Sequence, residues 1–318
     1  MLSLVIPCYN EEGNVEIFYN ETVRAFKGNI DEYEFVFVDD GSKDSTLSKL
    51  HYVFNNHKGD SNIQVLSFSR NFGKEAAIFA GLKAARGDYA CIIDADLQQR
   101  PEVVVEMMNI IENEENVDCV TAYQEERKES KLMAALKSSF YKTINKISDV
   151  EFVNGASDFR LMNRKMVDAV LSLGEYHRFS KGIFSFVGFN NKYIPYEVQE
   201  RQSGSSKWNF IKLLKYAIEG IVSFTTFPLK LASYVGIISS IVSIIYLIIV
   251  VIEKLFFGIN VPGYATIVVL LLLIGGIQLF SLGILGEYLS KVYDQVKERP
   301  IYILKEHLTD GDKNEKTD

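Results

Sequence analysis

The chain has 318 residues, a formal net charge of −7 and a hydrophobic content of 47%. This length allows one large domain with an additional segment, and the negative charge excludes a chain that binds nucleic acid through a basic surface. The average hides a division, because residues 1–230 have the composition of a soluble α/β protein whereas residues 231–286 carry almost no charge. Cys8, Cys91 and Cys119 lie in apolar runs without metal-type spacing, so we expect buried thiols in a reducing compartment.

The first part of the chain alternates short apolar runs with helical stretches. Met1–Pro7 has no basic leader, and we interpret it as part of a first strand rather than a signal peptide. The predicted strands are Leu2–Ile6, Glu34–Val38, Gln64–Ser67, Tyr89–Ile93 and Val117–Ala122. The predicted helices lie near Val15–Phe26, Ser45–Phe54, Glu75–Ala85 and Glu102–Glu112. This alternation predicts an α/β domain with a mostly parallel sheet.

Polar clusters follow the first four predicted strands. They are Pro7–Glu12, Asp39–Ser42, Ser69–Lys74 and Asp94–Gln98. Ligands of parallel sheets bind at the carboxyl ends of the strands, so these clusters predict one site along one edge. The chain lacks a G-x-G-x-x-G segment after the first strand and has no Walker lysine loop, which argues against the ordinary dinucleotide and P-loop sites.

Two pairs of carboxylates are candidates for ligand binding in these clusters. Asp39 and Asp40 are placed to accept hydrogen bonds from a base or ribose, although a simple turn or helix cap is the alternative. Asp94 and Asp96, two residues apart, are expected to point the same way and to need a cation between them. A hard divalent ion fits, with Gln98 as a further oxygen ligand or as the holder of a bound water, and the alternative is a solvated acidic turn. The four histidines have no zinc-ligand spacing.

Two uncharged segments predict two membrane-spanning helices. Leu231–Ile252 is the first, and Leu255–Gly286, densest over Tyr264–Leu285, is the second. Each is long enough to cross a bilayer, which needs about 20 apolar residues. Basic residues precede the first segment and follow the second, whereas the connection carries only Lys254, offset by Glu253. The positive-inside rule therefore places both termini in the cytoplasm.

The segment before the spans has helical periodicity. In residues 209–230 apolar side chains recur at helical spacing between lysines, which predicts an amphipathic helix that ends at Pro228. It is expected to lie in the membrane interface, with packing on the soluble domain as the alternative. Lys131–Ile147 is a second such candidate. The C-terminal tail, residues 287–318, is expected to be cytosolic, and to be polar and frayed from Lys305.

The ordered set of motifs resembles a known family. The chain resembles the inverting family 2 glycosyltransferases of the GT-A fold, and more narrowly the polyprenyl-phosphate glycosyltransferases, which include dolichyl-phosphate mannose synthases and bactoprenol glucosyltransferases. The motifs that carry the resemblance, over roughly residues 1–300, are Val5–Glu12, Val38–Ser42, Arg70–Lys74, Asp94–Gln98, Ser157–Arg160 and Ser206–Trp208. The resemblance implies a cytosolic GT-A nucleotide-sugar-binding domain over residues 1–208, an amphipathic interface helix over 209–230 and two transmembrane helices over 231–286.

The resemblance also implies roles for individual residues. The nucleotide-sugar would contact Pro7, Tyr9, Asn10, Glu11, Asp39, Asp40 and Asp94, and Mg²⁺ or Mn²⁺ would bind at Asp94, Asp96 and Gln98. Asp158 would lie near the reacting sugar, first as a positioning group and second as a base. Arg201 and Lys207 would act on the phosphates from a mobile loop. Candidates for the acceptor phosphate are Arg127, Lys128 and Arg178, each with a solvated surface position as the alternative.

The resulting functional prediction is transfer of a hexose, with UDP-glucose as first choice, to undecaprenyl phosphate at the cytoplasmic face of a bacterial plasma membrane. UDP-N-acetylglucosamine and GDP-mannose are alternative donors. A processive polysaccharide synthase is disfavoured because the chain has no Gln-x-x-Arg-Trp segment and only two predicted spans. A non-catalytic membrane adaptor is disfavoured because the predicted metal ligands are present. The expected partners are the donor, the lipid acceptor and the membrane, with no nucleic acid, and the family allows a homo-oligomer.

Overall fold

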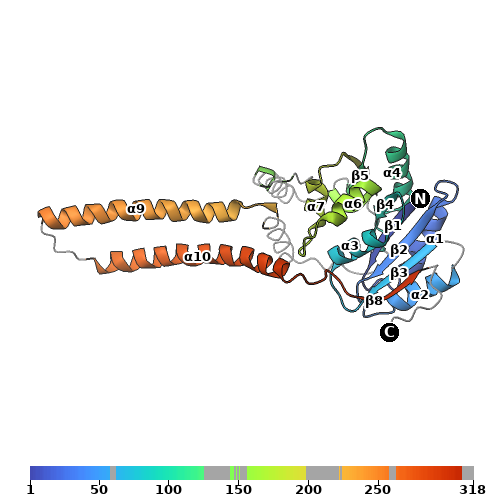
Figure 1. Cartoon of the computed structure of the whole chain (residues 1–318), viewed down its shortest axis with the longest axis horizontal. Coiled ribbons are helices and arrows are strands. Elements are labelled where there is room, and N and C mark those ends of the chain that lie inside the picture. Colours follow the sequence, from blue (N-terminus) through green and yellow to red (C-terminus); the bar gives the residue numbers. More distant parts are fainter. Residues whose placement is uncertain are drawn as a thin grey trace.

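A computed structural model describes residues 1–57, 62–124, 144–146, 148, 150, 156–197, 222, 224–257 and 263–309. An α/β domain lies at one end of the molecule, and a hairpin of two long helices extends away from it (Figure 1). The polar C-terminal segment returns from the hairpin to the α/β domain (Figure 1).

Eight strands form one mixed sheet in the order β7-β5-β6-β4-β1-β2-β3-β8. The central strands β3, β2, β1 and β4 are parallel, and β6 runs antiparallel to both β4 and β5. The strands are β1 (Leu2–Cys8), β2 (Tyr33–Asp39), β3 (Asn62–Phe68), β4 (Tyr89–Ile92), β5 (Cys119–Gln124), β6 (Ala156–Asn163), β7 (Asn191–Tyr196) and β8 (Leu304–Thr309). The five predicted strands, β1 to β5, are confirmed. They could be recognised in the sequence because buried parallel strands are continuous apolar runs. Strands β6, β7 and β8 were not predicted.

Helices cover both faces of this sheet. They are α1 (Val15–Phe26), α2 (Thr46–Asn56), α3 (Lys74–Ala84), α4 (Pro101–Asn113), α6 (Arg164–Ser172) and α7 (Ser180–Phe186). The first four match the predicted helices within two residues at each end. Alternation along β1 sends Leu4 and Ile6 into the core under α1, α2 and α4, and Val5 into the core under α3, α6 and α7. All three cysteines are free and buried, as predicted.

Helix α3 lies very close to the sheet. A Cβ atom on Gly81 would collide with the Val5 side chain, so glycine allows this approach. The tight packing fixes the direction of α3 and brings its first residue, Lys74, to the carboxyl end of the sheet. The position of Lys74 at the carboxyl end of the sheet therefore depends on the absence of a side chain at Gly81.

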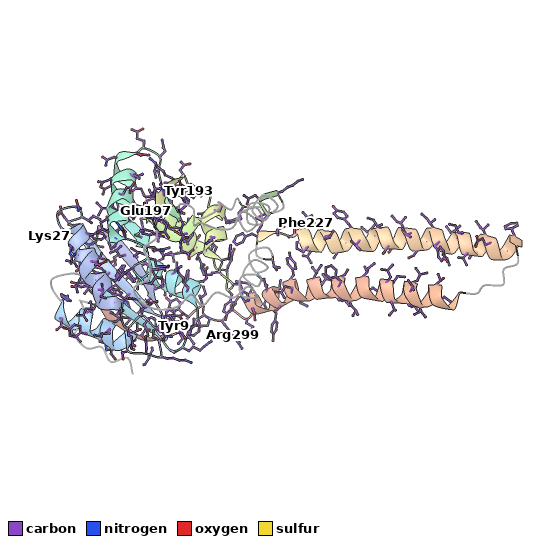
Figure 2. The ribbon with its side chains drawn as sticks, turned by 180° about the vertical axis from the view of Figure 1, so that it is seen from behind. Tyr9, Lys27, Tyr193, Glu197, Phe227 and Arg299 are labelled. Carbon is purple, nitrogen blue, oxygen red and sulfur yellow. The ribbon has the colours of Figure 1, made fainter. Side chains whose placement is uncertain are left out.

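The two predicted spans are helices, α9 (Phe227–Phe257) and α10 (Tyr264–Val296). Phe227–Glu253 and Thr266–Val296 are long and apolar enough to cross a membrane, by length and composition. Most of their apolar side chains are exposed (Figure 2). Helix α10 continues ten residues beyond the predicted end at Gly286. Pro228 lies in the first turn of α9, where the missing N–H of proline is tolerated.

The polar segment after α10 differs from the prediction. It was expected to be frayed from Lys305, but Leu304–Thr309 forms β8, which pairs antiparallel with β3. Ahead of β8, the ring of Tyr302 stacks on that of Phe68, with centroids 5.0 Å apart. An edge strand is held by backbone hydrogen bonds to one neighbour and packs with one face only. Few of its residues must therefore be apolar, and its sequence does not stand out as a strand. We call residues 297–303 the C-terminal strap.

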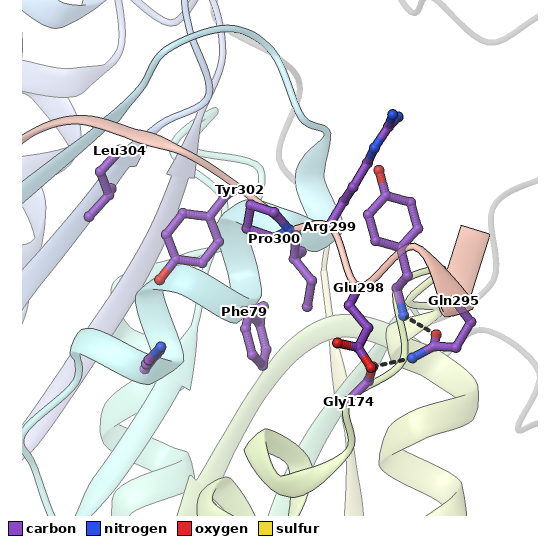
Figure 3. A pocket seen from close by; sticks show the side chains of 11 residues that line it. Phe79, Gly174, Gln295, Glu298, Arg299, Pro300, Tyr302 and Leu304 are labelled. Carbon is purple, nitrogen blue, oxygen red and sulfur yellow. Dashed lines mark hydrogen bonds between the residues drawn. The ribbon is translucent and has the colours of Figure 1, made fainter. Parts of the chain in front are cut away.

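The last turn of α10, just before the strap, contacts the α/β domain directly. The Gln295 side chain accepts a hydrogen bond from the Tyr176 N–H at 2.8 Å and donates one to the Gly174 carbonyl at 2.9 Å (Figure 3). His177 Nε2 lies 2.9 Å from Asp294 Oδ2. A pocket of about 580 Å³ remains between the strap, Phe79 of α3 and these contacts (Figure 3). The end of α10 is thus attached directly to the domain that carries the candidate site.

The remaining segments with predicted periodicity are mostly outside the described residues. These are the interface helix predicted over 209–230 and the candidate over Lys131–Ile147. Thr225 and Thr226 are non-helical and directly precede the first residue of α9.

Candidate active site

Asp39, the last residue of β2, and Asp40 after it connect the ends of β2 and β3. Asp39 accepts hydrogen bonds from the Ser42 N–H at 3.1 Å and from the Ser67 hydroxyl at 2.8 Å. Asp40 accepts from the backbone N–H groups of Phe72 (2.6 Å) and Gly73 (2.9 Å). Burial raises the pKa of Asp40 to about 6, although these N–H bonds lower it. Both carboxylates therefore have partners within the protein, and their contact with a nucleoside stays a prediction.

Gly41 allows this junction of loops. Its φ is +62°, in the left-handed region, and a Cβ atom there would collide with the backbone of Arg70 and Asn71. The loop after β2 and the loop after β3 can touch only because this position has no side chain.

The loop after β1 is bound to the same junction. The Asn10 N–H donates to the Ser42 hydroxyl at 3.0 Å, and Asn10 Oδ1 accepts from the Lys43 N–H at 3.0 Å. The Glu11 N–H donates to Thr46 Oγ1 at 2.8 Å. Pro7 lies within β1, paired with Val38, and Tyr9 is 38% exposed. Among the residues predicted to bind the donor, Tyr9 (labelled in Figure 2) thus presents an aromatic ring to solvent.

The turn after β4 holds Asp94 in place through a residue that was not predicted. Gln99 is 6% exposed and accepts from the Asp94 N–H at 2.9 Å, while its amide donates to Asp94 Oδ2 at 3.3 Å. The Gln98 N–H donates to Asp96 Oδ1 at 3.2 Å. Leu97 has a φ of +62° and is buried, so the turn uses a costly backbone conformation. This folds the three predicted metal ligands into one short turn.

Strand β6 brings Asp158 to this turn. In the antiparallel pairing of β4 with β6, Ile92 is opposite Arg160. The same register, extended by two residues beyond the end of β4, places Asp94 opposite Asp158 of β6. The sequence motif alone gave no reason to place these two carboxylates side by side.

Lys74 lies between the two carboxylates. Its ammonium is 2.7 Å from Asp94 Oδ1, 2.9 Å from Asp94 Oδ2 and 3.3 Å from Asp158 Oδ2. Burial lowers the pKa of Lys74, but the charges and hydrogen bonds of both aspartates outweigh this and leave the pKa above its ordinary value. Lys74 was not among the predicted site residues, although it ends the motif after β3. A lysine in that motif was a signal that could have identified it.

A second layer of charged groups surrounds Asp158. Arg160 is 3% exposed, and its guanidinium lies 3.9 Å above the Phe184 ring. Burial raises the pKa of Asp158, but Lys74, Lys181 and Arg160 outweigh it and hold the pKa below its ordinary value. Within the described part of the chain, Asp158 Oδ1 is buried without a hydrogen-bond partner. An orphaned acceptor of this kind is typical of a site that awaits a ligand.

Glu75, the residue after Lys74, fastens α3 to α7. It accepts hydrogen bonds from the Ser180 N–H at 3.0 Å and from the Ser180 hydroxyl. Burial and the charge on Asp158 raise the pKa of Glu75 to about 7, against the lowering effect of the Ser180 bonds. The residues on both sides of Lys74 are therefore anchored, Gly73 by Asp40 and Glu75 by Ser180.

Arg178 makes contacts that differ from those predicted. Its guanidinium donates to the carbonyl oxygens of Leu173 at 2.6 Å and Val170 at 3.1 Å, and it lies 4.4 Å above the Phe79 ring. These bonds cap the C-terminal end of α6, which is a structural role, and the contact of Arg178 with the acceptor phosphate stays a prediction. The other predicted phosphate ligands, Arg127, Lys128, Arg201 and Lys207, lie outside the described residues.

The residues after β4 fit a hard divalent cation. Across the described ranges, no group of three or more histidine, cysteine, aspartate or glutamate side chains is arranged to enclose a metal ion. Asp94, Asp96 and Gln98 offer oxygen atoms only, which Mg²⁺ and Mn²⁺ prefer when water and substrate phosphates complete the shell. Asp94 already holds a cationic group at 2.7 Å. The donor set therefore fits an open site that a phosphate ligand completes.

Comparison with known proteins identifies the family of the chain. Residues 3–171 match the model of glycosyl transferase family 2, and residues 227–292 match that of the GtrB C-terminal hairpin. A putative glycosyltransferase, CsbB, of Bacillus subtilis is 42% identical over 96% of this chain and 92% of its own length. A bactoprenol glucosyl transferase of Shigella phage SfII is 42% identical over 96% of this chain and 97% of its own.

A solved structure is also similar. Glucosyl-3-phosphoglycerate synthase from Mycobacterium tuberculosis is 16% identical, with a TM-score of 0.45 over 70% of this chain and 77% of its own. The α/β fold, the acidic strand ends and the family match together define a glycosyltransferase. The chain belongs to glycosyl transferase family 2, and the resemblance stated from its motifs is confirmed.

Proposed function

We propose that this enzyme transfers a hexose, most simply glucose from UDP-glucose, to a polyprenyl phosphate at the cytoplasmic face of a membrane. One observation carries the proposal: the domain that holds the Asp94–Lys74–Asp158 cluster is attached, through Gln295 at the end of α10, to two helices able to cross a membrane. The relatives named bactoprenol glucosyl transferase support a lipid acceptor and glucose.

On the donor side, the loops after β1 and β2 would receive the nucleoside. Tyr9 offers an exposed ring for the base, and Asp39 and Asp40 hold the loops around it. Asp94, Asp96 and Gln98 would hold Mg²⁺ or Mn²⁺, and that ion supplies stabilisation of the charge growing on the leaving diphosphate. Arg201 and Lys207 would add positive charge to the same phosphates.

On the acceptor side, a phosphate oxygen bonds to the anomeric carbon as the bond from that carbon to the diphosphate breaks. The acceptor monoester has a second pKa of about 6 and is largely dianionic at neutral pH, so it needs little help from a base. Asp158 keeps its charge because its pKa lies below the ordinary value, which makes it a weak base. We therefore assign Asp158 to orient the reacting sugar. Direct displacement inverts the anomeric centre and gives a β-linked product from an α-linked donor.

The hairpin would place this chemistry beside the lipid. Lys230 lies in the first turn of α9, and Lys297 and Arg299 follow α10, which favours a cytoplasmic position for both ends of the hairpin. UDP-N-acetylglucosamine and GDP-mannose are the alternative donors for the same reaction. Arg127 and Lys128 stay candidates for the acceptor phosphate.

The test is transfer of label into a lipid. Detergent-purified protein is incubated with undecaprenyl phosphate, Mg²⁺ and one radiolabelled nucleotide-sugar at a time, and label is counted in the organic phase. We expect label from UDP-glucose, none with Asp96→Ala, and normal transfer with Asp168→Ala, which removes an exposed carboxylate on α6. If another nucleotide-sugar labels the lipid instead, the proposed sugar is wrong and the lipid acceptor stands. Transfer to a soluble sugar or a polymer, with none to the lipid, would refute the lipid acceptor.

A further inference from the structure

We propose that Lys74 is a built-in competitor for the divalent cation: its ammonium neutralises Asp94 while no donor is bound, and it moves off Asp94 when the metal–donor complex arrives. This inference rests on the metal site of the proposed function. It assigns a role to Lys74, which ends the Arg70–Lys74 motif and has no step in the proposed mechanism.

The contact geometry is that of a cation on a carboxylate. Lys74 Nζ is within 2.9 Å of both carboxylate oxygens of Asp94, so the ammonium faces the same two atoms that a divalent ion would use. Two cations cannot share that face at short range without strong repulsion. A metal ion that binds through this side of Asp94 must therefore displace the ammonium.

The ammonium can move while its backbone stays in place. Gly73 and Glu75, on either side, are hydrogen-bonded to Asp40 and Ser180. The Lys74 side chain is nevertheless 43% exposed, and the Asp94 side chain is 29% exposed. The flexible four-carbon stem of lysine then allows the charge to shift without a change in the fold.

The two partners of Lys74 are not equivalent. Asp158 also feels the positive charges of Lys181 and Arg160, whereas Lys74 is the one cationic side chain that pairs with Asp94 in the described ranges. Asp94 thus loses its counter-charge when Lys74 leaves, and a metal ion restores it. Lys74 keeps Asp158 as a partner and stays beside the reacting groups. Because of this difference, we expect the ammonium of Lys74 to leave Asp94 and to stay beside Asp158.

The inference predicts that removal of the ammonium strengthens the binding of metal alone. The probe is Mn²⁺, measured by electron paramagnetic resonance on the full-length protein in detergent without nucleotide. We expect Lys74→Met and Lys74→Gln to bind Mn²⁺ about tenfold more tightly than the unmodified protein, and Lys74→Arg to bind it about as weakly. Lys83→Met is the matched control, because Lys83 is an exposed lysine on the same helix, and it should leave the affinity unchanged.

Two further variants keep the test decisive. Asp94→Asn should abolish the gain when combined with Lys74→Met, which locates the bound ion at this carboxylate. Thermal unfolding of each variant identifies loss of fold, and two neutral replacements guard against misfolding of one. Equal or weaker Mn²⁺ binding by folded Lys74→Met and Lys74→Gln would overturn the inference. So would a gain that survives Asp94→Asn.

Failure of this inference is distinguishable from failure of the proposed function. If the unmodified protein labels the lipid but the Lys74 variants do not change Mn²⁺ affinity, the displacement is wrong and the reaction stands. If Mn²⁺ binding tightens as expected but no lipid is labelled, the displacement stands and the acceptor is wrong.

Discussion

Apolar side chains are buried in the α/β domain and exposed in the helical hairpin. Leu4 of β1 is fully buried between strands and helices, whereas Leu272 of α10 is 72% exposed. Apolar side chains are driven out of water in both regions, but only the domain contains partners that cover them. An apolar surface as long as α9 and α10, uncovered by the chain itself, requires an apolar surrounding such as a lipid bilayer.

The two regions differ in charge as well. The domain gathers Lys74, Asp94, Asp158 and their neighbours at one edge of the sheet, while the spans carry almost no charge. They meet at the strap, and also where the Tyr288 hydroxyl of α10 donates to the Thr225 carbonyl at 2.6 Å. The charged groups of the candidate active site thus belong to the domain, and the apolar surface that can enter a membrane belongs to the hairpin. Variants can therefore disrupt the active site and the hairpin separately.

The largest effect should come from the charged cluster. Asp94→Asn removes a carboxylate that we propose as a metal ligand and also breaks the pair with Lys74, so transfer to lipid should fall at least about a thousandfold. The measurement is initial rate in the lipid-labelling assay. The variant should still enter the membrane fraction, because the hairpin is untouched. Activity within tenfold of the unmodified protein would contradict the assignment.

Truncation of one leucine in each region tests the comparison of burial. Leu4→Ala leaves a cavity in the closed core and should lower the free energy of unfolding of the domain by about 2–5 kcal/mol. Leu272→Ala, which truncates an exposed side chain of α10, should change it by less than about 0.5 kcal/mol. Denaturant unfolding in detergent, followed by fluorescence, measures both. Similar losses for the two variants would mean that α10 is covered by protein rather than by lipid.

A buried carboxyl of the domain should give stability a pH dependence that the hairpin lacks. The pKa of Glu75 is raised to about 7 from its ordinary 4.5, so the native state binds the proton more tightly than the unfolded state. Its contribution is fully present below about pH 4.5 and is lost as pH rises through about 7. Glu75→Gln should therefore unfold like the unmodified protein at pH 4.5 and be more stable at pH 8, by at most about 3 kcal/mol. A constant difference across this pH range would contradict the shift.

The smallest effect should come from the junction. Gln295→Ala removes two hydrogen bonds between α10 and the loop before α7, which together contribute about 1–2 kcal/mol. Hydrogen exchange should increase in β8 and the strap, while β1 and β2 stay protected. Glu298→Ala, at the same pocket without a hydrogen bond to that loop in the described residues, is the control (Figure 3). Equal protection in both variants would show that the strap is held by β8 alone.

Much of the molecule follows from local sequence. The four strand–helix units are predictable because buried parallel strands are short continuous apolar runs and their helices have periodic apolar faces. The two spans are predictable because only long uncharged runs cross a bilayer. The carboxyl ends of the strands then indicate where Asp39 and Asp94 lie, since all parallel strands end on one edge. Strand β8 gave no such signal, because its few apolar residues cover one face of an edge strand.

The sequence by itself thus determined the fold class, the hairpin and the acidic edge. The tertiary structure decided which charges meet there. Asp158 comes to Asp94 through the antiparallel pairing of β6 with β4, and Lys74 comes to both because Gly81 lets α3 approach the sheet. Pairing between distant segments is made by backbone hydrogen bonds, which every residue can accept and every residue except proline can donate, so it leaves little mark in the pattern of side chains.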